Sequence, residues 1–164
     1  MKITKIKDLN NIPEGITELD ISGLGLTTLP KLSQGLTVLD CSINKLTSLE
    51  NLPQGLTTLY CNSNELKILE NLPQGLTVLD CSRNKLTSLE NLPQELNTLI
   101  CIGNKLTSLD IAHCYKLKSV RCNDNNFPGE MQTILDDEDL TIQEKINKLI
   151  KGCLIPNDNS YVLK

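Results

Sequence analysis

A 20-residue repeat runs through most of this 164-residue chain. The units are residues 16–35, 36–55, 56–75, 76–95 and 96–116, with a truncated one beginning at Leu117. The second and fourth units are identical at 18 of 20 positions, and the second and third at 13, whereas the fifth has 21 residues. Self-similarity at a fixed period of this length indicates a solenoid, in which each coil of chain stacks on the one before it.

Within each unit, apolar and polar residues alternate over a short stretch. In the second unit Leu39 and Cys41 point to one side, while Asp40 and Ser42 point to the other, as in a half-buried strand. Strands are predicted to begin at Ile16, Leu36, Leu56, Leu76, Leu96 and Leu117. The rest of each unit has no helical periodicity and is stopped in three units by Pro53, Pro73 and Pro93, so it has room only for a turn and an extended segment. The predicted fold is a repeat solenoid with a parallel sheet on its concave face and extended return segments on its convex face.

The repeated skeleton is Leu-x-x-Leu-x-Cys-x-x-Asn-x-Leu-x-x-Leu-x-x-Leu-Pro. In this skeleton the chain resembles leucine-rich repeat proteins of the short, 20-residue class, whose units carry an LPxxLxxL stretch. That class is best known from bacterial effector proteins, and similar cysteine-bearing units occur in large DNA viruses. The resemblance covers about three quarters of the chain. It implies a non-enzymatic module that binds another protein through its concave sheet.

Composition narrows the range of partners and compartments. A net charge of −4 argues against a nucleic-acid partner or an anionic membrane surface, since both need a basic face. The first residues lack the apolar run of a signal peptide, and no window resembles a membrane span. Seven cysteines without an export signal favour reduced thiols in the cytoplasm, or in a host cytoplasm if the protein is an effector or viral protein.

Two columns of polar or reactive side chains are predicted to be structural. The first contains Cys41, Cys61, Cys81, Cys101 and Cys122, and the second contains Asn44, Asn64, Asn84, Asn104 and Asn125. Ile21 takes the place of the cysteine in the first unit, so that position is expected to be buried and apolar. An inward asparagine after each strand can donate to backbone carbonyls and accept a backbone N–H.

The side chains on the outward positions of the strands are the candidate functional residues, because core packing does not specify them. The candidate protein-binding residues are Val38, Asp40, Ile43, Tyr60, Val78, Asp80, Arg83, Ile100 and Arg121. Tyr60, Arg83 and Ile100 are the candidate anchors, since tyrosine and arginine are favoured at interface centres. The alternative is that Val, Ile and Thr occupy these positions only because they suit strands.

No catalytic or metal-binding residue, and no cofactor, is predicted. Cys122 and Asp124 match the Cys-x-Asp motif of the ubiquitin ligases among the bacterial effectors, but they fall in a repeat strand and only about 40 residues follow. His113 lies beside Cys114 in the irregular unit and is expected to be a loop residue. A carboxylate at one position of each unit (Glu50, Glu70, Glu90 and Asp110) is expected to be solvated.

The two ends of the solenoid are treated separately. Residues 1–128 are assigned to the repeat domain, and residues 129–164 to a helical cap and tail. Thr141 and Glu144 form a capping box, and Gly152 ends the predicted helix. The apolar residues assigned to this region are Met131, Ile134, Leu135, Ile142, Ile146, Leu149, Ile150 and Cys153. The helix could instead bind a partner.

The chain begins in mid-coil, which leaves the first strand to be covered by residues 1–8, by a second copy or by nothing. If that edge is uncapped, it could support self-association.

Three functions are consistent with these features. The first is a protein-interaction module that uses the concave sheet. The second is a structural repeat array without a dedicated partner, which the near-identity of units 36–55 and 76–95 would suit. The third is a substrate-reading fragment of a ubiquitin-ligase-type effector that lacks its catalytic domain.

Overall fold

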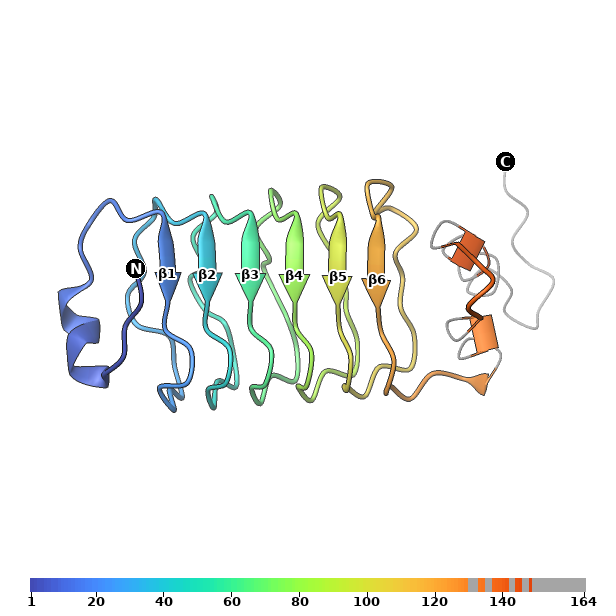
Figure 1. Cartoon of the computed structure of the whole chain (residues 1–164), viewed down its shortest axis with the longest axis horizontal. Helices are drawn as coiled ribbons and strands as arrows, with labels where there is room; N and C mark the ends of the chain where they lie inside the picture. Colours follow the sequence, from blue (N-terminus) through green and yellow to red (C-terminus); the bar gives the residue numbers. More distant parts are fainter. Residues whose placement is uncertain (130–132, 135–136, 142–143, 146–147, 149–164) are drawn as a thin grey trace.

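Six parallel strands stand side by side in chain order and form a single sheet (Figure 1). The computed structural model describes residues 1–129, 133–134, 137–141, 144–145 and 148. The strands are β1 (Glu18–Asp20), β2 (Val38–Asp40), β3 (Thr58–Tyr60), β4 (Val78–Asp80), β5 (Thr98–Ile100) and β6 (Ser119–Arg121). The return segments contain turns and extended chain, without a helix, so the predicted solenoid and its parallel sheet are confirmed.

The register between strands reproduces the sequence repeat. Leu19 pairs with Leu39 at an offset of 20 residues, and the same offset holds up to β5. Leu99 pairs with Val120 at an offset of 21, which absorbs the extra residue of the irregular unit. Because the offset is constant, each position of the repeat forms a straight column across the sheet.

The strands are three residues long and begin two residues later than the sequence predicted. The backbone N–H groups of Thr37 and Val38 both donate to the carbonyl of Thr17, at 2.8 and 3.1 Å. Two donors on one carbonyl interrupt the regular ladder, so the strand begins only at Val38. Leu36 is fully buried but lies outside the strand.

The core is built from columns of leucine and cysteine rather than from aromatic rings. Leu39, Leu59 and Leu79 lie in register and are inaccessible to solvent, as are Cys41, Cys61, Cys81 and Cys101. Within the described residues Phe127 is the one aromatic side chain in this core. Each buried leucine stabilises the fold by about 1.5–3 kcal/mol, but only when a neighbouring coil covers it.

An asparagine ladder ties each coil to the previous one. The side-chain amide of Asn84 donates to the carbonyls of Cys81 in its own coil and Cys61 in the preceding coil, both at 3.0 Å. Its carbonyl oxygen accepts the N–H of Leu66 at 3.0 Å. Asn44, Asn64, Asn104 and Asn125 make the equivalent bonds in their coils. The predicted role of this column is confirmed.

The N-terminal edge is covered by the first residues of the chain, which is one of the three possibilities given above, and the first strand is not an uncapped edge. Lys2 forms a parallel bridge to Asp20. The N–H of Ile3 donates to the carbonyl of Asp20 at 2.8 Å, and the side chain of Ile3 enters the core. A 3-10 helix, η1 (Ile6–Asn11), follows at the same end of the solenoid (Figure 1). Residues 1–3 thus take the place that a preceding coil would occupy.

The predicted capping box of the C-terminal region is present. The backbone N–H of Thr141 donates to the carboxylate of Glu144 at 2.9 Å, and the N–H of Glu144 approaches the Thr141 hydroxyl at 3.3 Å. Ile134 packs against the core cluster. The predicted Gly152 terminus and the apolar residues Met131, Leu135, Ile142, Ile146, Leu149, Ile150 and Cys153 lie outside the described residues. The division at residue 128 therefore stays a prediction.

The asparagine ladder gives a stability prediction. Asn84→Ala strands the Leu66 N–H and the carbonyls that Asn84 binds, and should lower the free energy of unfolding by about 1–3 kcal/mol. Chemical denaturation measures this. Asn62→Ala is the control, because the half-buried Asn62 side chain makes no hydrogen bond to a described residue; its effect should stay within about 0.5 kcal/mol. Equal effects of the two substitutions would contradict the ladder.

Candidate protein-binding surface

Outward side chains of the strands form two neighbouring columns on the exposed face of the sheet, called here the sheet face. One column runs Asp20, Asp40, Tyr60, Asp80, Ile100, Arg121, and the other runs Glu18, Val38, Thr58, Val78, Thr98, Ser119. Seven of the nine candidate residues fall in these columns, so the structure brings them together on one surface. The other two, Ile43 and Arg83, follow their strands by three residues.

A short turn after β2 and β4 fixes two of the candidate carboxylates. Oδ1 of Asp40 accepts the backbone N–H of Ser42 at 2.9 Å and its hydroxyl at 2.6 Å. Asp80 and Ser82 make the same pair of bonds, at 3.0 and 2.6 Å. Both serines are buried. The sequence pattern predicts that the fold does not require particular residues at the outward positions. For Asp40 and Asp80 this is wrong in part, because each aspartate is needed for its Asp-x-Ser turn.

Three strands lack the Asp-x-Ser turn. Their residues in that column are Tyr60, Ile100 and Arg121, and the residues two positions later are Asn62, Ile102 and Asn123. Tyr60 is 36% exposed, although it is one of the few aromatic residues in the chain. Because both the aspartate and the serine are replaced in these three units, the outward residue has no turn to stabilise. Tyr60, Ile100 and Arg121 are therefore the sheet-face residues that the fold specifies least.

The position of Ile43 and Arg83 imposes a left-handed backbone. Its φ is 55° at Ile43 and 51° at Arg83, and the two glycines in the same column, Gly23 and Gly103, have φ of 69° and 67°. A β-branched residue with such a φ is a genuine outlier, because its Cβ crowds the backbone. Ile43 is nevertheless 63% exposed and gains little burial in return. This constraint was not predicted from the sequence, although the two glycines of the column were a signal of it.

The first carbons of the Arg83 side chain lie against the next coil. A Cβ placed on Gly103 would lie 3.5 Å from Cγ of Arg83, so a glycine at that turn leaves room for the arginine stem. The Arg83 side chain is exposed.

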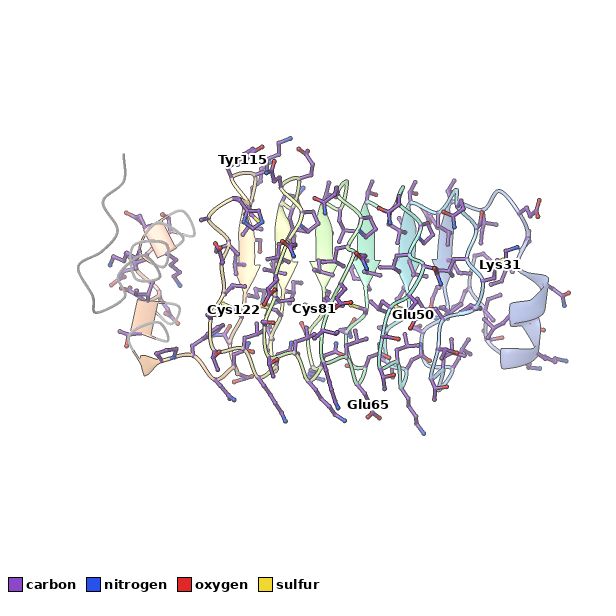
Figure 2. The ribbon with its side chains drawn as sticks, turned by 180° about the vertical axis from the view of Figure 1, so that it is seen from behind. Lys31, Glu50, Glu65, Cys81, Tyr115 and Cys122 are labelled. Carbon is purple, nitrogen blue, oxygen red and sulfur yellow. The ribbon has the colours of Figure 1, made fainter. Side chains whose placement is uncertain are left out.

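The cysteine column is part of the packed interior rather than a reactive site. Burial raises the pKa of the Cys41 thiol to about 12, and it also raises the pKa of Cys61 and Cys81. Figure 2 shows Cys81 and Cys122 within the body of the solenoid. Cys122, the cysteine of the Cys-x-Asp match, is only 3% exposed. A protonated, covered thiol is a poor nucleophile, which agrees with the predicted packing role.

The irregular unit docks on the preceding coil residue by residue. Four consecutive contacts join the two coils: His113 Nε2 to Leu92 O (2.7 Å), Cys114 Sγ to Pro93 O (3.7 Å), Tyr115 Oη to Gln94 Oε1 (3.3 Å) and Lys116 Nζ to Glu95 Oε2 (2.6 Å). Tyr115 lies at the edge of the solenoid opposite Glu65 (Figure 2). The turn itself is kept, since the N–H of Leu117 donates to the carbonyl of Cys114 at 3.0 Å as that of Leu96 does to Pro93 at 3.1 Å.

The carboxylates of the return face do not converge. Glu50, Glu70 and Glu90 are exposed and lie one coil apart. Hollows of about 560 and 500 Å³ open between successive coils, the first lined by Glu50 and Glu70 and the second by Glu70 and Glu90. Across the described ranges, no three or more His, Cys, Asp or Glu side chains are grouped to hold a metal ion. In those same ranges no helix has the length and apolar character needed to cross a bilayer.

Solved structures with the same architecture identify the class of protein. YopM from Yersinia enterocolitica WA-314 is similar over 71% of this chain, at 35% identity and a TM-score of 0.67. A Shigella effector leucine-rich repeat domain is similar over 81% of the chain and 80% of its own length, at 26% identity and a TM-score of 0.62. YopM from Yersinia pestis is similar over 73% of the chain, at 28% identity and a TM-score of 0.56.

The chain is a leucine-rich repeat protein of the short-repeat class and resembles bacterial effectors, as its sequence predicted. This fold is generally a scaffold for protein interaction. The chain spans 26% of the Yersinia enterocolitica protein and 39% of the Yersinia pestis protein. No protein-family model matches the sequence, and a search of curated proteins finds no significant match.

The left-handed backbone at Ile43 gives a second stability prediction. Asparagine tolerates this conformation better than a β-branched residue does, so Ile43→Asn should raise the free energy of unfolding by about 1 kcal/mol. Ile68 is a matched control, since it is 50% exposed and is not among the residues with positive φ. Ile68→Asn should give no stabilisation. A loss of stability in Ile43→Asn, measured by urea unfolding, would contradict the strain.

The buried thiols predict a loss of stability at alkaline pH. Below the ordinary thiol pKa of 9.0 these groups are protonated in the folded and the unfolded chain. As pH rises from there toward the raised folded values, the unfolded thiols ionise first, so the unfolded state binds fewer protons and the free energy of unfolding falls. The fall should be shallower in Cys81→Ala than in the parent, in denaturant titrations at pH about 8 and about 10. Parallel profiles would contradict this account.

Proposed function

We propose that this protein is a non-enzymatic interaction module that binds another protein through its sheet face. The candidate contacts are the nine residues predicted from the sequence, with Tyr60, Ile100 and Arg121 at the least constrained positions. The leucine-rich repeat fold and its likeness to effector structures support this proposal. Nucleic acids and membranes are not the proposed partners, because the net charge is −4.

The main support for the proposal is that three of the six strands lack the Asp-x-Ser turn. In β1, β2 and β4 that turn satisfies backbone groups and fixes a carboxylate. In β3 the same positions hold an exposed tyrosine and an asparagine. Tyrosine offers a large contact area at low entropic cost, so its exposed part on the face of the sheet is suited to contact with a partner.

The residues at the position of Ile43 and Arg83, where the backbone is left-handed, argue against a repeat array without a partner. The two most similar units differ at this position, by Ile43 against Arg83, where the backbone would be best served by Gly or Asn. A neutral copy gains nothing from a strained, exposed isoleucine. The third alternative, a substrate reader for a ubiquitin ligase, has no observation on the described residues in its favour.

The compartment and self-association follow as parts of the same proposal. Covered, neutral thiols suit a reducing cytoplasm, or a host cytoplasm if the protein is an effector. Self-association through the first strand would need displacement of residues 1–3, which already bond to β1. A second copy is therefore a weaker candidate partner than a different protein.

A paired-variant capture experiment tests the binding surface. Tyr60→Ala with Arg83→Glu removes an exposed aromatic and reverses a charge on the sheet face. Ile68→Ala with Lys67→Glu makes a similar change on the return side of the same coil, where both residues are exposed. A partner whose binding saturates is first identified by quantitative capture with the parent protein. The Tyr60/Arg83 variant should lose this partner, and the Ile68/Lys67 variant should keep it. Unchanged capture by the Tyr60 variant would place the site elsewhere.

A further inference from the structure

The centre of the sheet face has an aromatic ring between two carboxylates. Tyr60 pairs in register with Asp40 on one side and with Asp80 on the other. Neighbouring strands lie about 4.8 Å apart, so the two aspartates are separated by about 10 Å across the tyrosine. Both aspartates are half-buried, and Val38 and Val78 stand beside them in the adjoining column.

The two carboxylates are held in place before any partner arrives. In each, Oδ1 is occupied by the backbone N–H and the hydroxyl of the serine two residues later. The other oxygen, Oδ2, is the one left to meet an external donor. A fixed carboxylate loses little conformational freedom on binding, which favours a charge-assisted hydrogen bond.

The first strand shows what an aspartate of this column binds. Oδ1 of Asp20 accepts the Ser22 N–H and hydroxyl, as in the later strands, while Oδ2 contacts Nζ of Lys2 at 2.8 Å. The described residues contain two further ion pairs, Lys85 with Glu65 and Lys116 with Glu95. Neither Asp40 nor Asp80 belongs to any of the three. They repeat the arrangement of Asp20 without its cation.

Neither Lys2 nor Arg83 forms an ion pair with Asp40 or Asp80 among the described residues. Lys2 is bonded to Asp20 and feels the charge of Asp40 without pairing with it. The face of a tyrosine ring attracts a cation, and a planar guanidinium can stack on the ring while it donates to carboxylates at its edges. An ammonium is a compact charge and would engage one carboxylate at a time.

We propose that the sheet face binds its partner by accepting an arginine side chain over Tyr60, between the carboxylates of Asp40 and Asp80. This inference rests on the protein-binding function proposed above and adds the chemistry of the partner, which presents an exposed, arginine-bearing segment. Asp40 and Asp80 supply the charge and Tyr60 the stacking surface. Ile100 and Arg121 lie two and three strands from Tyr60 on the same face, and Ile43 follows β2, so these residues would contact the rest of the partner.

Three peptide probes test this directly on the full chain. They are an acetylated hexapeptide of three Gly-Arg units, the same peptide with lysine, and the same peptide with neutral citrulline. Affinity is measured by NMR titration at low and moderate salt. The arginine peptide should bind saturably and more tightly than the lysine peptide, and the citrulline peptide should not bind. Tyr60→Leu should weaken arginine binding about threefold.

A matched pair of double variants separates this site from net charge. Asp40→Asn with Asp80→Asn keeps the Oδ1 acceptors and their serine turns, so the fold is preserved while two charges are lost. Glu70→Gln with Glu90→Gln loses the same two charges on the return face. The first pair should weaken binding of the arginine peptide about tenfold or more, and the second less than about twofold.

Each other outcome overturns the inference. If both pairs of substitutions weaken binding of the arginine peptide equally, the peptide is attracted by net charge alone. Tighter binding of the lysine peptide would contradict the preference for arginine. Absence of saturable binding would reject the site. If the Tyr60/Arg83 variant loses the captured partner while the two aspartate substitutions affect neither partner nor peptide, this inference fails and the proposed function stands. If peptide binding follows the prediction but partner capture does not, the proposed function fails instead.

Discussion

The asparagine ladder is the interaction on which the rest of the structure depends. Each coil ends its strand with a bend that would leave backbone carbonyls and N–H groups without partners inside a thin core. One asparagine per coil satisfies groups in its own coil and in the coil before it, as Asn84 does for Cys81, Cys61 and Leu66. The leucine and cysteine columns can stack in register only because this bend is the same in every unit.

A fold that repeats every bend also fixes much of its own surface. Asp40 and Asp80 belong to serine turns, and the position of Ile43 and Arg83 requires a left-handed backbone. Function must therefore be read from what each unit does differently within these constraints. Tyr60 occupies the place of the aspartate, so its unit lacks the serine turn. Ile43 is exposed and has an unfavourable left-handed backbone. Such local violations are expected where a surface has been retained for binding.

Periodicity was enough to predict the solenoid, the buried cysteines and the asparagine bonds, and the spacing of Thr141 and Glu144 was enough to predict the capping box. Each depends on residues whose spacing repeats or whose partners are close in sequence. The contacts of His113 could not be predicted, and residues 1–8 were only one of three possible covers for β1, because these contacts join segments about 20 residues apart without a repeated pattern. The serine turns were missed for another reason: Asp-x-Ser was present in the sequence, but its residues were assigned to the surface by alternation alone.

Amide hydrogen exchange is the most direct test of the ladder in the intact chain. The N–H groups of Leu66 and Leu86 donate to asparagine side chains rather than to a neighbouring strand. If the ladder holds the coils together, these two amides should exchange as slowly as that of Leu79 at the centre of β4, through the same global opening. Exchange of Leu66 and Leu86 at the rate of exposed turns, with Leu79 still protected, would contradict the account.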